Sequence, residues 1–343
     1  MSRIPSSLSA GKRKGLESVA DSRGIIAALA IDQRSALRSL FSKAMAVEPS
    51  AVSPDKLSQF KEAVSSILTP HASAILLDPE YGLPAAARRA PNAGLLLAYE
   101  QTGYDKTVPG RLPRLLDGWS VKHLIESGAN AVKLLLYFSS RSSAEINRAK
   151  YSFVEKVGAE CVAADVPFFL ELVSYAESMD EKGIEFARIK NEIVAAGMKE
   201  FSKPQYRVDV LKIGMPVNLS FVEGSPSPAG EILYSREQAK QHFLIAAACS
   251  SIPFIYLSEG ISNSTFQFGL QLASEVGAGY SGVLCGRATW KDGVEIFVKQ
   301  GVAALEDWLS REGVKNIENI NQCLAAAIPW FDAGRLAVSG GNQ

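Results

Sequence analysis

The chain has 343 residues, of which 47% are hydrophobic and 21% are charged, an ordinary composition for a globular protein. Lysine and arginine together number 36, as do aspartate and glutamate, so the formal net charge is zero. This balance argues against a nucleic-acid-binding protein or a general polyanion binder, and any anion must be recognised locally.

The cysteines and the chain ends predict a cytoplasmic protein without a membrane segment. Cys161, Cys249, Cys285 and Cys323 are far apart and form no CxxC pair, so we expect reduced thiols rather than a zinc or redox motif. The basic residues near the N-terminus precede no apolar run, and no stretch of about 18 apolar residues occurs. Neither a signal peptide nor a transmembrane helix is expected.

Eight short apolar runs recur along the chain, each followed by a longer segment. Most of the runs are continuous rather than alternating, which is typical of strands buried on both faces. They are Ile25–Ile31, Ser73–Leu77, Gly94–Tyr99, Ala131–Tyr137, Pro167–Val173, Val208–Ile213, Pro253–Leu257 and Tyr280–Cys285.

The longer segments between these runs are predicted to be helical. In one of them Ser53 is a plausible N-cap, Pro54 stands in the first turn, and the apolar residues follow at helical spacing. In another, Ser235 and Gln238 form a capping-box pattern. The predicted helices are Pro54–Leu68, Ser143–Ala164, Asp180–Phe201, Ser235–Ser250, Ser262–Val276 and Lys291–Glu312.

Strands that alternate with helices indicate a parallel sheet, and eight such units favour an α/β fold with a single (β/α)8 TIM barrel. The strand count alone would also fit a large doubly wound sheet. We expect short helical extensions at both ends. Residues 1–22 would form the N-terminal extension, 23–313 the barrel, and 314–343 a C-terminal helix and a flexible tail.

Three charged residues interrupt strands that otherwise read as buried. They are Lys133, Glu171 and Lys212, and Asp32 directly follows the first strand. A buried charge is costly unless it is paired or neutralised, so any one of these lysines could simply be a structural partner of Glu171. Together, at the mouth of one barrel, they indicate a Schiff-base enzyme, because a lysine near another cation and away from water loses its proton more easily.

The last two strands end in residues suited to a phosphate. Ser258 and Gly260 follow the seventh strand, and Gly286 and Arg287 follow the eighth. Barrels often bind phosphate at this place, where glycine lets backbone N–H groups approach an oxyanion and arginine adds a fork of donors. The glycines alone are a weak signal. Asp78 and Glu80 after the second strand could belong to the site or could cap the next helix.

No metal or other cofactor is predicted. The three histidines, His71, His123 and His242, show neither an HxH nor an HExxH spacing, and none lies at the end of a predicted strand. This favours lysine chemistry over zinc-assisted carbonyl chemistry.

Five stretches closely resemble the tagatose 1,6-bisphosphate aldolase family, a group of metal-independent class I aldolases. They are Ala28–Arg34, Ala131–Lys133, Asp209–Lys212, Pro253–Ser258 and Gly282–Trp290. The resemblance runs from about Lys14 to Trp330. It implies a TIM barrel that cleaves a ketohexose bisphosphate into dihydroxyacetone phosphate and glyceraldehyde 3-phosphate, with a sugar phosphate as its small-molecule partner.

The resemblance also implies roles for single residues. Lys212 would form the Schiff base, Glu171 would act as acid and base, and Asp32 and Lys133 would be their polar partners. Either Asp32 or Glu171 would take the proton of the C4 hydroxyl. The residues that would bind substrate and its C1 phosphate are Gln33, Arg34, Ser258, Gly260, Gly286 and Arg287.

Three places near the expected mouth depart from the family pattern. Gly214 stands where an acidic residue is typical, and Glu259 stands where a small residue is usual. After Leu136, the stretch Tyr137–Arg141 replaces a more acidic continuation. The sugar, the accepted C4 stereochemistry and the pathway therefore stay open, as does the formation of a homo-oligomer. The alternatives are an aldolase for a sulfonated ketose phosphate, a Schiff-base dehydratase or transaldolase, and a non-catalytic barrel that binds a sugar phosphate.

Overall fold

A computed structural model describes residues 8–333 of the chain. Eight parallel strands form a barrel in chain order, and it closes because β1 pairs with β8 from Ile26 opposite Gly282 to Leu29 opposite Cys285. This closure confirms the predicted TIM barrel and rules out the open sheet. The strands are β1 (Ile26–Ala30), β2 (Ala74–Leu77), β3 (Gly94–Ala98), β4 (Ala131–Phe138), β5 (Phe168–Ser174), β6 (Val210–Ile213), β7 (Phe254–Leu257) and β8 (Gly282–Cys285).

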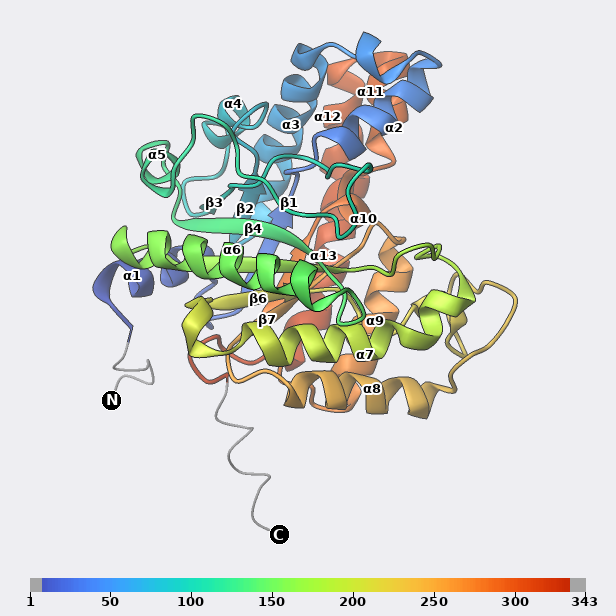
Figure 1. The fold of residues 1–343 in the computed structure, drawn as a ribbon. Helices are drawn as coiled ribbons and strands as arrows, with labels where there is room; N and C mark the ends of the chain where they lie inside the picture. Colours follow the sequence, from blue (N-terminus) through green and yellow to red (C-terminus); the bar gives the residue numbers. More distant parts are fainter. Residues whose placement is uncertain (1–7, 334–343) are drawn as a thin grey trace.

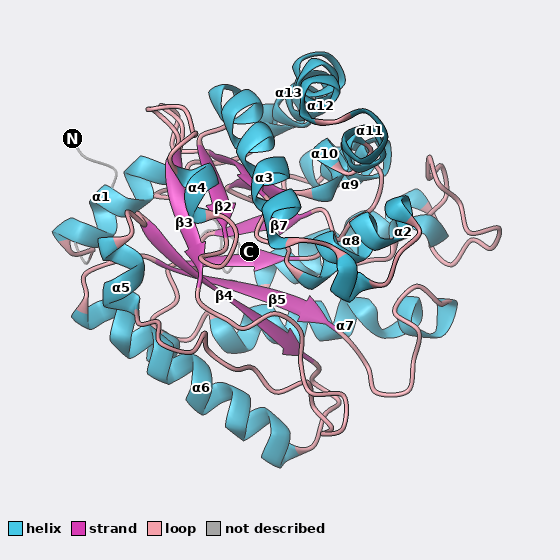
Figure 2. Cartoon of the chain, turned by 90° about the horizontal axis from the view of Figure 1, so that it is seen from above, coloured by secondary structure: helices cyan, strands magenta, loops and turns pink. Residues whose placement is uncertain are grey.

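Helices surround the barrel, as Figures 1 and 2 show. Ser53 caps the third helix and Ser235 forms the predicted capping box with Gln238. The helices are α1 (Ala10–Val19), α2 (Ser35–Met45), α3 (Pro54–Leu68), α4 (Leu83–Ala86), α5 (Val121–Glu126), α6 (Ala144–Ala163), α7 (Ile184–Phe201), α8 (Arg236–Ala248), α9 (Asn263–Glu275), α10 (Arg287–Trp290), α11 (Gly293–Gln300), α12 (Val302–Trp308) and α13 (Val314–Gln322).

The single helix predicted over Lys291–Glu312 was wrong. The backbone breaks at Gly301, which has a φ of 84° and separates α11 from α12. Glycine adopts this left-handed conformation without a steric penalty, so it ends one helix and begins the next. Beyond it, α12 continues through a π-helical turn at Leu309–Gly313 into α13. The boundary placed after residue 313 stays a prediction, and most of the expected tail lies outside the described residues.

The core has two parts. The larger one fills the space between the strands and the surrounding helices. The smaller one fills the inside of the barrel, where small side chains such as Ala28, Ala98 and Ala131 pack around Phe169. These residues alternate with the outward-facing ones along each strand. This alternation shows which residues of each strand face the inside of the barrel, including the strands that carry charged residues.

Helix α1 covers the amino-terminal end of the barrel. Leu16 and Val19 join the inner core. The helix lies very close to the strand starts, since a Cβ atom on Gly15 would stand 2.4 Å from the carbonyl oxygen of Asn130. Lys12 pairs with Asp209, just before β6, at 2.8 Å. A cavity lies at the other end, where the strands have their carboxyl ends.

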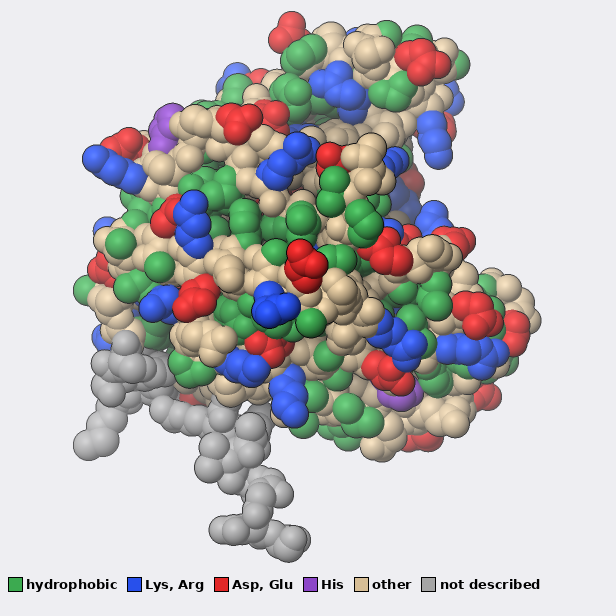
Figure 3. All heavy atoms as spheres, viewed as in Figure 1, with side chains coloured by type: hydrophobic (Ala, Val, Ile, Leu, Met, Phe, Trp, Pro, Cys, Tyr) green, Lys and Arg blue, Asp and Glu red, His purple; other side chains and the backbone are tan. Residues whose placement is uncertain are grey.

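Both signs of charge are mixed over the face shown in Figure 3, in keeping with the zero net charge. Within residues 8–333, no helix is long and apolar enough to cross a membrane.

The close approach of α1 can be tested with Gly15→Ala. Alanine favours a helix over glycine by up to ~1 kcal/mol, so a free helix would gain stability. Here the added methyl group meets the Asn130 carbonyl and Pro167. We therefore expect a net loss of about 1–3 kcal/mol in the free energy of unfolding, measured by urea denaturation. Glu17→Ala, on the exposed side of the same helix, is the control. Unchanged or raised stability of Gly15→Ala would contradict this packing.

Candidate active site

Four charged residues from four strands meet at the open end of the barrel. Lys133, Glu171 and Lys212 each lie two positions after an inward-facing core residue, and Asp32 follows Ala28 and Ala30 in the same alternation. The Nζ atom of Lys133 lies 2.8 Å from Asp32 Oδ2 and 2.8 Å from Glu171 Oε2. The Nζ atom of Lys212 lies 2.9 Å from the same Glu171 oxygen. The structure thus brings the four predicted catalytic residues together.

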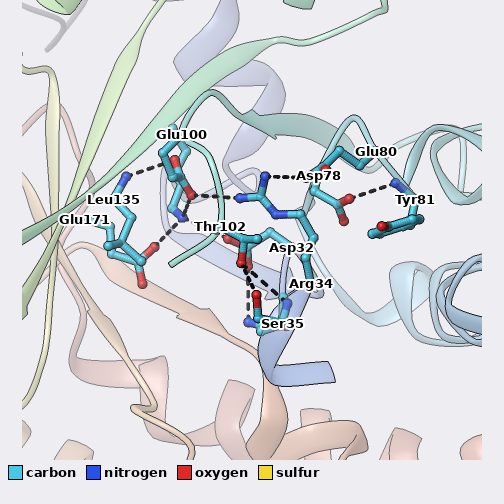
Figure 4. A network of polar contacts seen from close by, with 12 residues as sticks. Asp32, Arg34, Ser35, Asp78, Glu80, Tyr81, Glu100, Thr102, Leu135 and Glu171 are labelled. Carbon is cyan, nitrogen blue, oxygen red and sulfur yellow. Dashed lines mark hydrogen bonds and ion pairs between the residues drawn. The ribbon is translucent and has the colours of Figure 1, made fainter. Parts of the chain in front are cut away.

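Glu100 completes this group and was missed by the sequence analysis. It is buried, its Oε1 atom lies 2.7 Å from Lys133 Nζ, and its Oε2 atom accepts a hydrogen bond from the backbone N–H of Leu135 at 3.0 Å. Figure 4 shows its carboxylate beside those of Asp32 and Glu171. Alternation along the third strand could have found it, because Leu96 and Ala98 face inward and Glu100 is the next residue in that series.

The two lysines are held differently. Lys133 is fully buried and contacts three carboxylates, those of Asp32, Glu100 and Glu171. Lys212 contacts Glu171 alone among the carboxylates of the described residues. The shared Glu171 oxygen has ion-pair distances to both lysines but no aligned hydrogen bond within the described chain. The Lys212 amine is therefore the less constrained of the two.

The charge states follow from this arrangement. Burial favours a neutral Lys133, but the charges of Asp32, Glu100 and Glu171 outweigh it and hold the pKa of Lys133 well above its usual value. Burial would also favour protonated carboxyl groups. The nearby Lys133 and Lys212 instead lower the pKa of both Asp32 and Glu171 below their usual ranges. At neutral pH the site therefore holds a fixed ammonium group between ionised carboxylates.

Arg34 and Gln33 line the cavity next to Asp32. Arg34 is buried, and its guanidinium pairs with Glu80 at 2.8 Å and with Glu100 at 3.6 Å, as Figure 4 shows. Gln33 donates a hydrogen bond from Nε2 to Asp32 Oδ1 at 3.2 Å. Its Oε1 atom is buried without a hydrogen-bond partner among residues 8–333. Gln33 thus keeps an unused acceptor beside the carboxylate group.

Asp78 holds Lys61, which in turn binds the backbone on both sides of Asp32. It is fully buried, forms an ion pair with Lys61, and accepts a hydrogen bond from the backbone N–H of Tyr81 at 2.8 Å. Lys61 also donates to the carbonyl oxygens of Ile31 and Gln33, at 2.7 and 3.0 Å, and so holds the backbone on both sides of Asp32. The helix-capping alternative was wrong for this residue, because Gly82 occupies the N-cap of α4.

The predicted phosphate residues divide into two groups. Gly260 and Arg287 line the cavity, which has a volume of about 800 Å³, whereas Ser258 and Gly286, like Lys133 and Lys212, do not contribute to its lining. Gly260 has a φ of 80°, and a Cβ atom there would stand 2.5 Å from Cζ of Arg287. Only a glycine lets this guanidinium lie against the backbone. Within the described part of the chain Arg287 has no ion-pair partner, so its charge is available to an anion.

A metal site is not evident in the described residues. Among residues 8–333 no three His, Cys, Asp or Glu side chains are grouped so that they could hold a metal ion. The carboxylates of the site instead surround the ammonium group of Lys133.

Known proteins are similar to this chain over most of its length. A family model described as DeoC/LacD family aldolase matches residues 26–292. Tagatose 1,6-diphosphate aldolase 2 of Enterococcus faecalis is 53% identical over 325 residues, which cover 94% of this chain and 96% of that protein. Tagatose 1,6-diphosphate aldolase of Listeria monocytogenes serotype 4a is 46% identical over 323 residues, which cover 94% of each chain.

Solved structures share the barrel. A Schiff-base-forming fructose-1,6-bisphosphate aldolase superposes with a TM-score of 0.53 at 15% identity, covering 85% of this chain and 96% of that one. An archaeal fructose 1,6-bisphosphate aldolase gives a TM-score of 0.52 at 14% identity, covering 87% and 98%. At these identities the likeness supports the fold.

We expect Lys133→Met to lower the free energy of unfolding by an amount that depends on pH. Removing this ammonium group leaves Asp32 without an ion-pair partner among the described residues and takes one of two cations from Glu100 and Glu171, which should cost about 3–5 kcal/mol near neutral pH. In the wild type the lowered pKa values of Asp32 and Glu171 stabilise the fold above their unfolded values of 3.8 and 4.5. In the variant these groups can escape the penalty only by protonation. The loss should therefore be largest near pH 8 and shrink toward about pH 5.

Urea denaturation at several pH values measures this effect. Lys150→Met is the matched control, because Lys150 is also buried but its amine contacts the hydroxyl and ring of Tyr175 and forms no ion pair among residues 8–333. Burial lowers the pKa of Lys150 to about 8. Its replacement should cost much less. A pH-independent loss in Lys133→Met would contradict the charge states assigned here.

Proposed function

Because the chain belongs to the DeoC/LacD family of aldolases, we propose that it is a class I aldolase that reversibly cleaves tagatose 1,6-bisphosphate into dihydroxyacetone phosphate and glyceraldehyde 3-phosphate. The curated relatives at 46–53% identity support this substrate. The observation that carries the chemistry is the unequal environment of the two buried lysines, one enclosed by three carboxylates and one in contact with a single carboxylate.

Lys212 is the proposed nucleophile. Lys133 is held as a cation by its three carboxylates, and an ammonium group has no lone pair with which to attack a carbonyl. Lys212 has fewer partners, and its neighbour Glu171 can accept and return protons at hydrogen-bond range. The amine attacks C2 of the ketose, and the carbinolamine loses water with Glu171 as the proton donor. The product is an iminium ion.

Cleavage follows from the electron demand of that iminium ion. When a carboxylate removes the proton of the C4 hydroxyl, the C3–C4 bond breaks, its electron pair moves toward the iminium nitrogen, and the C4 half leaves as an aldehyde. Asp32 and Glu171 are both ionised and both line the cavity, so each can serve as this base. Protonation of the remaining enamine at C3 and hydrolysis release dihydroxyacetone phosphate and restore Lys212. Proton transfer by such a positioned group typically contributes ~10²–10⁴-fold.

The C1 phosphate is proposed to bind at Arg287. This guanidinium lies beside the backbone of Gly260, on the side of the barrel formed by β7 and β8. Lys212 stands on the neighbouring β6. The proposed C1 phosphate site therefore lies on the same side of the barrel as the amine that attacks C2. Remote binding of this kind positions the ketone against the amine. The four free cysteines fit our further proposal of a cytoplasmic protein that acts on small sugar phosphates and not on nucleic acid.

The covalent site can be tested by trapping. Incubation with tagatose 1,6-bisphosphate or dihydroxyacetone phosphate and borohydride should add the mass of the reduced adduct to the peptide that contains Lys212. Lys212→Ala should lose the adduct and nearly all turnover, while keeping its circular dichroism spectrum. An adduct on the peptide of Lys133 instead would reverse the roles of the two lysines.

The phosphate site can be tested by steady-state kinetics of Arg287→Ala. Loss of a charged hydrogen-bonding group on the substrate should raise KM by about 10- to 100-fold. Some loss of kcat is expected, because the same contact positions the ketone. Arg141→Ala is a surface control, since Arg141 pairs with the exposed Glu192. An unchanged KM in folded Arg287→Ala would place the C1 phosphate elsewhere.

A further inference from the structure

A second arginine faces the cavity from the side opposite Arg287. Arg111 belongs to the segment between β3 and α5, and it lines the cavity together with Tyr104 and Tyr137. In a closed barrel of eight strands in chain order, β3–β5 lie across the mouth from β7 and β8. The carboxylates and lysines of the reaction centre therefore lie between two arginines.

Three tyrosine rings enclose the Arg111 guanidinium. Its Cζ atom lies 4.4 Å from the ring centroid of Tyr175, 4.8 Å from that of Tyr104 and 5.5 Å from that of Tyr137. Aromatic rings attract a cation through their quadrupole without neutralising its charge. This cage fixes the guanidinium and leaves its N–H edges for an anion.

The partners of Arg111 leave room for such an anion. Its one carboxylate contact in the described chain is Glu181 at 2.6 Å, and the Glu181 side chain is 40% exposed. The Tyr137 hydroxyl, which also faces the cavity, has no hydrogen bond within residues 8–333. An exposed carboxylate can move into solvent, because pairs of this kind contribute little stability.

The backbone at Arg111 has an uncommon conformation. Arg111 has a φ of 48° and the preceding Gly110 a φ of 96°. A left-handed arginine is uncommon and persists only where the surroundings impose it. Here the backbone N–H of Gly110 donates to Glu177 at 2.8 Å, and a Cβ atom on Gly110 would lie 2.7 Å from Ile146. The segment is thus held in the conformation that directs Arg111 to the cavity.

The tyrosine cage lies further along the strands than the reaction centre. Tyr137 lies four residues beyond Lys133 on β4, and Tyr175 lies four residues beyond Glu171, so the cage stands up to ~13 Å further along the strands. Leu135 and Val173 line the cavity in between. Arg111 is too far along the strands to act on C2 or C3, but it can reach a group several bonds away.

We propose that Arg111, with the Tyr137 hydroxyl, binds the C6 phosphate of the ketohexose bisphosphate, the phosphate that leaves on the aldehyde product. The phosphate takes the place of Glu181 at the guanidinium. This rests on the proposed aldolase function and adds that Arg111 determines the preference for a bisphosphate over a ketose 1-phosphate.

The test compares two substrates that differ only in that phosphate. Purified full-length wild type and Arg111→Met are assayed on tagatose 1,6-bisphosphate and on tagatose 1-phosphate. The variant should lose about 10- to 100-fold in kcat/KM on the bisphosphate, the size expected for a charged hydrogen bond. On the 1-phosphate its kcat/KM should stay within about threefold of the wild type. Arg111→Lys, which keeps the charge without the planar fork, should give an intermediate bisphosphate preference.

Two further variants act as controls. Arg141→Met removes an exposed arginine that pairs with Glu192 and does not line the cavity, and it should change neither activity. Arg287→Ala should weaken both substrates, because both carry the C1 phosphate. Borohydride trapping with dihydroxyacetone phosphate, which lacks the C6 end, should be equal in the wild type and Arg111→Met, and this reports an intact site.

The outcomes separate the inference from the proposed function. Equal losses on both substrates, or no loss on either, would overturn the assignment of Arg111. If Arg111→Met does not fold, Arg111→Lys and Tyr137→Phe carry the test, and an unchanged bisphosphate preference in both would overturn it. A wild type that cleaves neither sugar and forms no borohydride adduct would instead refute the aldolase function.

Discussion

The buried ammonium group of Lys133 is the interaction on which the rest of the site depends. It ties together carboxylates that follow β1 and β3 and lie on β5, so one cation fixes the relative positions of three strand ends. An ion pair in the interior is favourable only when its geometry is nearly complete, since removing charges from water is costly. Three carboxylates at 2.7–2.8 Å meet that condition.

The same constraint separates the roles of the residues around it. Lys133 and Arg34 are already paired with the carboxylates of Asp32, Glu100 and Glu80, so these buried cations are not free to bind a phosphate. Anions are drawn instead to the rim, where Arg287 lacks a carboxylate partner in residues 8–333 and Arg111 has an exposed one. The carbonyl of the substrate can then lie over these buried ion pairs while its two phosphate groups lie at Arg111 and Arg287.

The barrel and most of its buried charged residues could be predicted from the sequence, because apolar runs and strand alternation are local signals. They located all eight strands, and the charged inward positions Lys133, Glu171 and Lys212 stood out against Ala131, Phe169 and Val210. The rest depends on contacts between distant segments. The Lys61–Asp78 pair, the engagement of Arg34 by Glu80 and the tyrosine cage of Arg111 leave no periodic trace. The break at Gly301 also escaped prediction, since one glycine inside a helical pattern is often tolerated.

Two of the three departures from the family pattern, Gly214 and Glu259, form one structural feature. A Cβ atom on Gly214 would stand 2.4 Å from Oε1 of Glu259, so the carboxylate of Glu259 occupies the space that a side chain at position 214 would need. Lys190, itself buried, holds the other oxygen of Glu259 at 2.7 Å. A negative charge therefore stands on this wall of the cavity, supplied from β7 rather than β6. A larger residue at position 214 would meet the end of the Glu259 side chain, so the Glu259 carboxylate would have to move away from its contact with Lys190 or be replaced by a smaller residue.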